Sequence, residues 1–206
     1  NMKMENNSNT ISKKKQLGQY FTPKHVVQFL LSGLKKKPQT ILDPNAGNGL
    51  FLEECNSKFH SAEIFGVELD EKQICKNPSI KFVHGDIFNW TKNQIKEKTF
   101  QQFSAVVGNP AYVNYQNLNK LTVNLDDEPS NDYKSYLLDA IKEIAEFTGE
   151  LSKLEDVFRL WSKLGDFNAY MLILSWLLTK QNGTIAFVMS NHWMERDYGK
   201  IIRHFF

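Results

Sequence analysis

The chain has 206 residues, of which 41% are hydrophobic, and a formal net charge of +2 at pH 7. This length suffices for one large α/β domain with its own core, and the small net charge does not by itself indicate a nucleic-acid binder. The sequence lacks an apolar run long enough for a membrane span, and its polar, Asn-rich start lacks the apolar core of a signal peptide. We therefore expect a soluble, cytoplasmic protein without a membrane partner.

The two ends of the chain and its cysteines set the expected domain limits. Residues 1–12 are polar and are predicted to form a disordered tail, in which Asn1 before Met2 indicates the remnant of a cleaved tag. Cys55 and Cys75 have neither metal-ligand spacing nor a neighbouring His cluster, so we expect reduced thiols and no metal site. Residues 13–206 are predicted to form a single domain.

A turn rich in Gly and aromatic residues precedes the first predicted helix. Thr22 is predicted as the N-cap and Pro23 as the first helical residue, and this helix start is explained by capping alone or by an additional contact with an anion such as an amino-acid carboxylate. The apolar positions that predict the helix are Val26, Val27, Phe29, Leu30 and Leu34.

A glycine-containing loop follows the first predicted strand, residues 40–42. The loop reads Asp-Pro-Asn-Ala-Gly-Asn-Gly from Asp43 to Gly49 and leads into a helix. Glycines between a strand and a helix let a ligand approach the backbone closely, as in nucleotide-binding turns. The second predicted strand, residues 63–67, ends at Glu68, which lies about 20 residues after the loop, where a dinucleotide-binding fold places an acid on ribose hydroxyls.

The third predicted strand, residues 80–83, is again followed by an acid, Asp86. One acid after a strand is commonly a helix cap, but Asp43, Glu68 and Asp86 after three successive strands indicate a ligand crevice at one sheet edge. Asp86 can accept a hydrogen bond from an adenine amino group, with Ile87 and Phe88 as apolar walls.

The fourth predicted strand begins at Phe103 and stops at the turn Gly108-Asn109-Pro110-Ala111-Tyr112. Asn, Pro and Gly are ordinary turn formers. A planar amino group such as adenine N6, however, is a poor nucleophile until acceptors meet both of its hydrogens. The Asn109 side chain and the Pro110 carbonyl can be those acceptors, and the Tyr112 ring can stack on the base.

The second half of the sequence predicts a helical insertion, an apolar helix and a fifth strand. Residues 114–165 form the insertion, whose apolar pattern favours a cover on the sheet over a DNA contact; the pattern comprises Leu137, Ile141, Ile144, Phe147 and Leu151. The apolar helix starts near Phe167, which lines a cofactor pocket or lies in the core. Asn182-Gly183 is predicted to close this helix before a strand over residues 184–189.

Taken together, these segments resemble the DNA adenine-N6 methyltransferases of restriction-modification systems, in the motif order that places the cofactor motif first, as in fused type IIG enzymes. Residues 18–23 resemble the first cofactor motif, residues 43–49 the Asp-Pro-x-x-Gly-x-Gly loop, Glu68 the ribose acid, Asp86 the adenine acid, and residues 109–112 the catalytic Asn-Pro-Pro-Tyr. The resemblance implies an α/β, Rossmann-like fold with a mostly parallel twisted sheet and helices on both faces.

The resemblance also implies S-adenosylmethionine as the methyl donor and double-stranded DNA with a flipped target adenine as the substrate. The implied catalytic residues are Asn109, Pro110 and Tyr112. The implied cofactor-binding residues are Tyr20, Thr22, Asp43, Asn45, Gly47, Gly49, Glu68, Asp86, Ile87 and Asn109.

The sequence departs from the family pattern at two points. Ala111 stands where the family usually has a second Pro, which loosens the turn. The chain also stops before the late catalytic motif and the target-recognition region, so we expect a fold truncated at its carboxyl end and the amino-terminal part of a longer protein. Two alternatives stay open: methylation of a glutamine side chain in a protein, and a catalytically silent cofactor- or DNA-binding module of a larger complex.

Overall fold

The computed structural model describes residues 22–34, 37–110, 133–160, 167–189 and 199. Its centre is a five-stranded sheet in the order β3-β2-β1-β4-β5, and every pair of neighbouring strands is parallel. This confirms the predicted α/β fold. The strands are β1 (Thr40–Asp43), β2 (Glu63–Glu68), β3 (Ile80–His84), β4 (Phe103–Gly108) and β5 (Thr179–Phe187).

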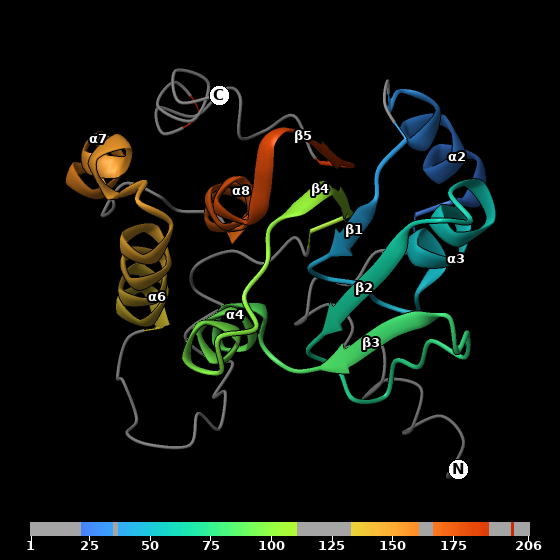
Figure 1. Ribbon diagram of the computed structural model, residues 1–206, viewed down its shortest axis with the longest axis horizontal. Helices are drawn as coiled ribbons and strands as arrows, with labels where there is room; N and C mark the ends of the chain where they lie inside the picture. Colours follow the sequence, from blue (N-terminus) through green and yellow to red (C-terminus); the bar gives the residue numbers. More distant parts are fainter. Residues whose placement is uncertain (1–21, 35–36, 111–132, 161–166, 190–198, 200–206) are drawn as a thin grey trace, which may run out of the picture.

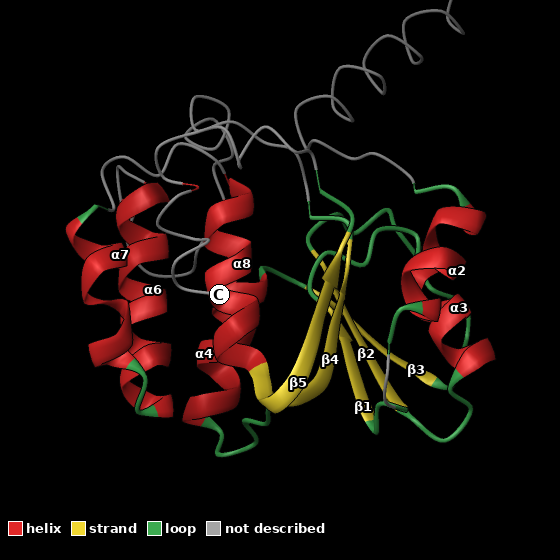
Figure 2. Ribbon diagram, turned by 90° about the horizontal axis from the view of Figure 1, so that it is seen from above, coloured by secondary structure: helices red, strands yellow, loops and turns green. Residues whose placement is uncertain are grey.

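Helices cover both faces of the sheet (Figure 2). One face carries α2 (Lys24–Ser32) and α3 (Leu50–Lys58), and the other carries α4 (Ile87–Lys96) and α8 (Phe167–Leu178). Beyond α4 and α8 lies an outer layer of α6 (Tyr133–Thr148), a short 3-10 helix η1 (Leu151–Leu154) and α7 (Glu155–Arg159) (Figures 1 and 2). Of the helices that the structure describes, none is both long and apolar enough to cross a membrane.

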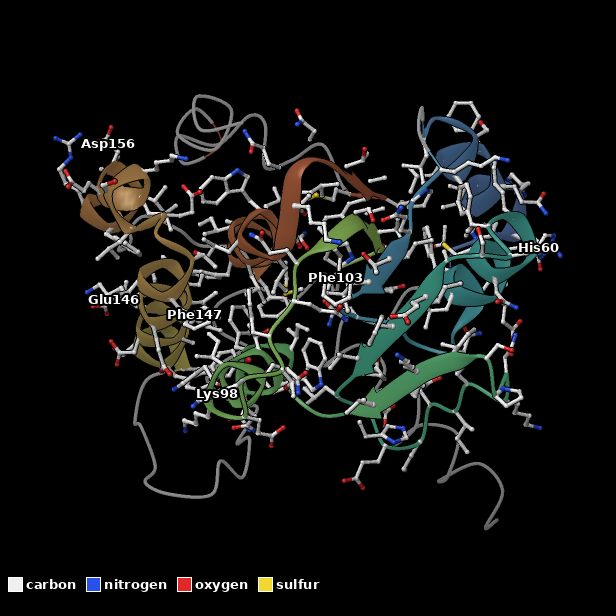
Figure 3. All side chains as sticks on the ribbon, viewed as in Figure 1. His60, Lys98, Phe103, Glu146, Phe147 and Asp156 are labelled. Atoms are coloured by element: carbon white, nitrogen blue, oxygen red, sulfur yellow. The ribbon has the colours of Figure 1, made fainter. Side chains whose placement is uncertain are left out.

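The central strands are buried on both faces, which explains their continuous apolar sequence. Leu42 and Val106 pair across β1 and β4 and pack into the core shared with α4, α6 and α8. Their neighbours Ile41 and Ala105 pack into the core shared with α2 and α3. Phe103, labelled in Figure 3, is fully buried at the start of β4.

Helix α2 starts one residue later than the sequence predicts. Pro23, with ψ at 141°, is the N-cap, and its carbonyl accepts hydrogen bonds from the N–H groups of Val26 and Val27. The assignment of Thr22 as N-cap is therefore wrong, because the chain is still extended at Pro23. The predicted apolar face is also only partly correct, since Val27 is buried whereas Phe29 is 79% exposed.

Within the insertion, α6 confirms the predicted apolar stripe at Leu137, Ile141 and Ile144, which are fully buried. Phe147 is 54% exposed, because at 3.6 residues per turn it lies roughly 90° away from the centre of that stripe. Leu151 is 39% exposed because the helix ends at Thr148 and the pattern does not continue beyond it. The helix packs on α4 and α8, so within the described part of the insertion α6 covers these helices and not the sheet itself.

The apolar helix and the fifth strand also meet earlier than predicted. Helix α8 ends at Leu178 and β5 begins at Thr179, so Asn182-Gly183 lies inside the strand and does not close the helix. The pairing steps from Phe103↔Thr179 to Ala105↔Thr184, and Asn182 takes a left-handed φ of 62° within the resulting irregularity. Asn tolerates this conformation, which explains why a turn-forming pair can stand within a strand.

Candidate functional site

Four polar side chains follow the strands at one edge of the sheet. Because all strands are parallel, their carboxyl ends lie at the same edge, and the strand order sets a row of Asp86, Glu68, Asp43 and Asn109. Open α/β sheets bind ligands outside this edge, where the chain order reverses, and here it reverses between β1 and β4. The structure therefore brings together the acids and the amide that the sequence singled out.

The loop after β1 is docked onto the end of β2. The Ala46 N–H donates to the Val67 carbonyl at 3.0 Å, and the Gly47 N–H donates to Oε2 of Glu68 at 2.7 Å. Gly47 and Gly49 have φ of 55° and 82°, in the left-handed region that favours glycine. A Cβ added to Gly47 would have no atom of the described residues within 4 Å, so a ligand can approach the backbone there.

Asp43 is the most deeply buried acid at this edge, with 1% of its surface exposed. Its Oδ1 accepts a hydrogen bond from the Asn45 N–H at 3.1 Å. Burial raises the pKa of Asp43 to about 8, the hydrogen bond from Asn45 opposes this rise, and the charge of Glu68 adds to it. The Oδ1 of Asn45 is buried and has no hydrogen-bond partner among the described residues, so this loop has an acceptor for a ligand donor.

Glu68 uses both carboxylate oxygens to hold main-chain groups. Oε2 accepts from Gly47 and Oε1 accepts from the Asp70 N–H at 2.8 Å, and the side chain is 7% exposed. Burial raises the pKa of Glu68, and the two main-chain hydrogen bonds oppose the rise. Each oxygen keeps a second lone pair, so Glu68 can still accept from ligand hydroxyls while it orders the glycine loop.

Asp86 is the N-cap of α4 and accepts hydrogen bonds from main-chain N–H groups and from two tyrosine hydroxyls. Oδ1 accepts from the Asn89 N–H at 2.9 Å and from the Tyr136 hydroxyl at 2.8 Å, and Oδ2 accepts from the Tyr133 hydroxyl at 3.2 Å. Burial raises the pKa of Asp86, while these hydrogen bonds act in the opposite direction. The two tyrosines were missed in the sequence, where only their spacing of three residues on a helix gave a signal.

The predicted apolar walls beside Asp86 belong to the core. Ile87 is the first residue of α4 and is 3% exposed, and Phe88 is fully buried. Phe88 contacts Phe167 edge-on, with ring centroids 6.3 Å apart, and Phe167 is 7% exposed. Of the two roles expected for Phe167, the structure thus shows the place in the core.

Asn109 and Pro110 follow directly after β4. Asn109 is half-buried and Pro110 is buried, and the Val188 N–H donates to the Gly108 carbonyl at 2.9 Å, which ties the segment after β5 to the end of β4. Thr22 is buried at the amino end of α2, which Figure 2 shows at the same edge as the carboxyl ends of the strands. Tyr20, Ala111, Tyr112 and the expected tail over residues 1–12 lie outside the described residues.

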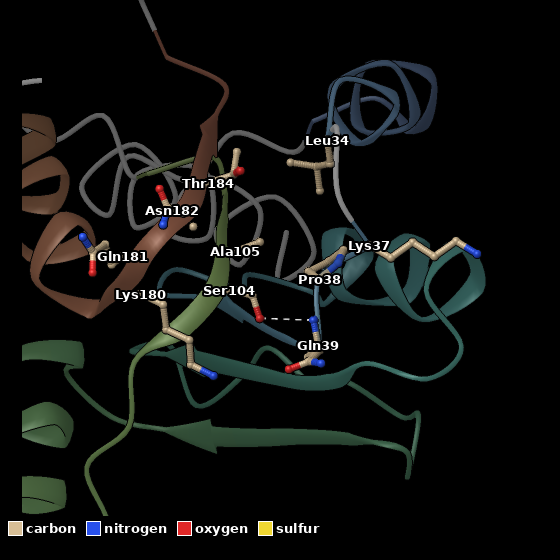
Figure 4. A pocket seen from close by; sticks show the side chains of 11 residues that line it. Leu34, Lys37, Pro38, Gln39, Ser104, Ala105, Lys180, Gln181, Asn182 and Thr184 are labelled. Atoms are coloured by element: carbon tan, nitrogen blue, oxygen red, sulfur yellow. Dashed lines mark hydrogen bonds between the residues drawn. The ribbon is translucent and has the colours of Figure 1, made fainter.

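A separate pocket of about 230 Å³ lies at the opposite edge of the sheet (Figure 4). It is lined by residues before β1, including Lys37 and Gln39, by Ser104 and by the irregular part of β5. Ser104 Oγ there accepts hydrogen bonds from the N–H groups of Gln39 and Thr40. The pocket is at the amino ends of the strands and contains none of the predicted site residues.

The described part of the chain shows no group of three or more His, Cys, Asp or Glu that could hold a metal ion, and Cys55 and Cys75 are both free thiols. The donors at the carboxyl edge are carboxylates, amides and main-chain groups. This set suits an organic ligand with amino, hydroxyl and cationic groups.

Comparison with known families decides the class of protein. The profile of the N-6 DNA methylase family matches residues 4–146, which is more than half of the chain. The chain belongs to the N-6 DNA methylase family. This family consists of S-adenosylmethionine-dependent methyltransferases.

Individual relatives of this N-6 DNA methylase include type II methyltransferases and a modification methylase. The type II methyltransferase M.HincII of Haemophilus influenzae is 34% identical over 111 residues, which cover 53% of this chain and 20% of the relative. The modification methylase CviBIII of Paramecium bursaria Chlorella virus NC1A is 30% identical over 184 residues, which cover 82% of this chain and 44% of the relative. The chain thus spans less than half the length of either relative.

The fold has counterparts among solved structures. A Listeria monocytogenes protein assigned to the class I S-adenosylmethionine-dependent methyltransferases superposes with a TM-score of 0.53, at 13% identity, over 91% of this chain and 52% of the other. At this identity the likeness shows the fold alone.

Proposed function

We propose that this N-6 DNA methylase is the catalytic part of an enzyme that transfers a methyl group from S-adenosylmethionine to adenine N6 in double-stranded DNA, within a restriction-modification system. The observation that carries the proposal is the row of Asp86, Glu68, Asp43 and Asn109 at the carboxyl edge of the sheet. The names of the relatives M.HincII and CviBIII support the restriction-modification context. In this proposal the target-recognition region belongs to a part of the protein beyond this chain, and a nuclease is either fused to it, as in type IIG enzymes, or separate.

The residues of the edge fit the proposed cofactor. S-adenosylmethionine supplies an electrophilic methyl group on a positively charged sulfonium. The three acids at this edge favour a cation, and a bound cation in turn favours their ionised form; Glu68 provides acceptors for ribose hydroxyls. The open backbone at Gly47 and the buried Oδ1 of Asn45 provide a close approach and an acceptor in the glycine loop. Thr22, at the amino end of α2, is proposed to contact the same ligand.

Catalysis is assigned to the turn after β4. The target adenine leaves the DNA stack, at a cost of a few kcal/mol, to reach a side chain at the sheet edge. The Asn109 side-chain oxygen and the Pro110 carbonyl accept the two N6 hydrogens, which localises the nitrogen lone pair for attack on the methyl carbon. The bound S-adenosylmethionine would supply the methyl carbon for the new N–C bond, its sulfur would keep the pair of the broken S–C bond, and the N6 proton would pass to water. Tyr112 is proposed to stack on the flipped base.

The test is transfer of labelled methyl from S-adenosylmethionine to unmethylated genomic DNA by the full-length protein, followed by nucleoside analysis. Label in N6-methyladenine is the expected result. Label in protein glutamine with none in DNA would overturn the DNA assignment in favour of the protein-substrate alternative.

Ala111 favours one other candidate, a catalytically silent cofactor- or DNA-binding module, because it replaces the second Pro of the family turn. The variant Ala111→Pro separates the two. If the unmodified protein is inactive and the variant methylates DNA, the module reading is correct; if the unmodified protein is already active, the enzyme reading is correct.

A further inference from the structure

The two tyrosine hydroxyls on Asp86 connect the insertion to the proposed cofactor site. Tyr133 and Tyr136 lie in the first turn of α6, three residues apart, and their ring centroids are 5.5 Å apart. Both hydroxyls reach the same carboxylate, which belongs to the connection between β3 and α4. None of the motif positions proposed from the family resemblance lies on this helix.

The hydrogen bonds are distributed unequally between the two carboxylate oxygens. Oδ1 accepts the 2.9 Å bond from the Asn89 N–H and the 2.8 Å bond from Tyr136, whereas Oδ2 accepts the 3.2 Å bond from Tyr133. Each oxygen of an ionised carboxylate has about two acceptor positions. The cap and Tyr136 therefore fix the rotation of the carboxylate, and of these three bonds Oδ2 accepts only the longest.

The surroundings also explain why Asp86 needs these donors. Burial raises the pKa of Asp86, which favours the neutral acid, and a neutral acid offers fewer acceptor positions to an amino group. Burial together with the charge of Asp86 raises the pKa values of Tyr133 and Tyr136, so both hydroxyls stay protonated and donate. Where α4 and α6 pack together, Lys92 on α4 and Glu143 on α6 pair with each other at 3.0 Å.

We propose that Tyr136 is a positioning residue of the cofactor site, which holds the Asp86 carboxylate as an oriented acceptor for the adenine amino group of S-adenosylmethionine. Tyr133 has the same role through its longer bond. This inference rests on the proposed function and adds α6, from within the insertion, to the cofactor site.

The experiment is a thermodynamic cycle. One change removes the Tyr136 hydroxyl from the protein, and the other removes the adenine amino group from the ligand. Binding of S-adenosylhomocysteine and of S-inosylhomocysteine, in which a carbonyl oxygen replaces the amino group, is measured by calorimetry for the full-length protein and for Tyr136→Phe. We expect Tyr136→Phe to weaken S-adenosylhomocysteine about tenfold, because a hydrogen bond to a charged group is removed. The affinity for S-inosylhomocysteine should change far less, so the ratio of the affinities for the adenosyl and inosyl ligands should fall in Tyr136→Phe.

Two control variants separate positioning from general support of α6. Thr148→Val removes a hydroxyl at the far end of α6 that bonds to carbonyls of its own helix. Lys92→Gln removes the ion pair that links α4 to α6. Both should leave the ratio of the two ligand affinities unchanged, even if they lower the melting temperature.

The outcomes are distinct. An unchanged affinity ratio in Tyr136→Phe, or tighter binding of S-adenosylhomocysteine, would overturn the inference and leave the proposed function intact. Failure of the unmodified protein to bind S-adenosylhomocysteine would overturn the proposed function and the inference together. If Tyr136→Phe does not fold, Tyr133→Phe gives the same readout with a smaller expected loss, and an unchanged ratio there would overturn the inference.

Discussion

The carboxylate of Asp43 lies against the backbone of Gly108 on the neighbouring strand, so that a Cβ added to Gly108 would be 2.6 Å from Asp43 Oδ1. Gly108 directly precedes Asn109. The glycine therefore allows the buried acid of the cofactor loop and the proposed catalytic turn to occupy adjacent strands.

From this contact we expect Gly108→Ala to destabilise the protein by about 1–3 kcal/mol, because the methyl group displaces a side chain with no free volume around it. The matched control is Gly85→Ala. Gly85 has a similar φ, 159° against 150°, but a Cβ there would meet no described atom within 4 Å. Urea unfolding of both variants measures the difference; equal losses would show that backbone conformation, and not the contact with Asp43, limits the position.

The buried state of Asp43 predicts a dependence of stability on pH. Its pKa is about 8 in the folded protein against an ordinary 3.8, so between these values the folded state holds a proton that the unfolded state has lost. The contribution of Asp43 to stability is therefore largest below pH 4 and declines as the pH rises towards 8, by at most about 1.4 kcal/mol per pH unit. Asp43→Asn should flatten the decline in urea unfolding between pH 5 and 8; identical slopes in both proteins would contradict the shifted pKa.

Proton release on ligand binding gives a second test of the same group. If the positive sulfonium favours the ionised form of Asp43, binding of S-adenosylmethionine at pH 7 should release a proton, since the pKa falls in the complex. Calorimetry in buffers of different ionisation enthalpy measures the number of protons released. The sulfur of the product S-adenosylhomocysteine is uncharged, so its binding should release fewer protons. Equal proton release with both ligands would argue against an interaction of the sulfonium with Asp43.

Glu68 should support both the glycine loop and the cofactor. Glu68→Gln replaces one carboxylate oxygen by an NH2 group, which cannot accept a hydrogen bond, so either the Gly47 or the Asp70 N–H loses its acceptor. We expect cofactor affinity to fall by a factor of ten or more. Glu63→Gln at the exposed start of β2 is the control, because its carboxylate makes only a surface ion pair with Lys81 at 3.5 Å. A similar loss in both variants would contradict a specific role for Glu68.

Asn109→Ala should separate catalysis from cofactor binding. Removal of the amide acceptor leaves the adenine lone pair delocalised, so we expect single-turnover methyl transfer by the full-length protein to fall at least about 100-fold. Cofactor affinity should stay within about a factor of three, since a lost neutral hydrogen bond has a modest net effect. Retained turnover would show that the amino group is activated elsewhere.

The sequence by itself predicted the features that depend on short-range pattern. The apolar β-branched runs marked β1 to β4, and the position of an acid or amide after each run predicted the polar row at the carboxyl edge. These predictions succeeded because parallel strands with buried faces have continuous apolar sequences, and because residues after such strands necessarily lie at one edge. The glycines of the 43–49 loop were also identified from the sequence, because a left-handed backbone conformation depends on the residue at that position and favours glycine.

Tertiary structure decided what depends on contacts between distant segments. The strand order, the bulge at Asn182-Gly183 and the approach of Asp43 to Gly108 follow from how β4 pairs with its neighbours. The partners of Asp86 were decided in the same way. Tyr133 and Tyr136 are about 50 residues away along the chain and reach Asp86 only because α6 packs on α4. No local pattern encodes such a pairing, because its energy comes from burying two helix faces together and from satisfying a half-buried carboxylate.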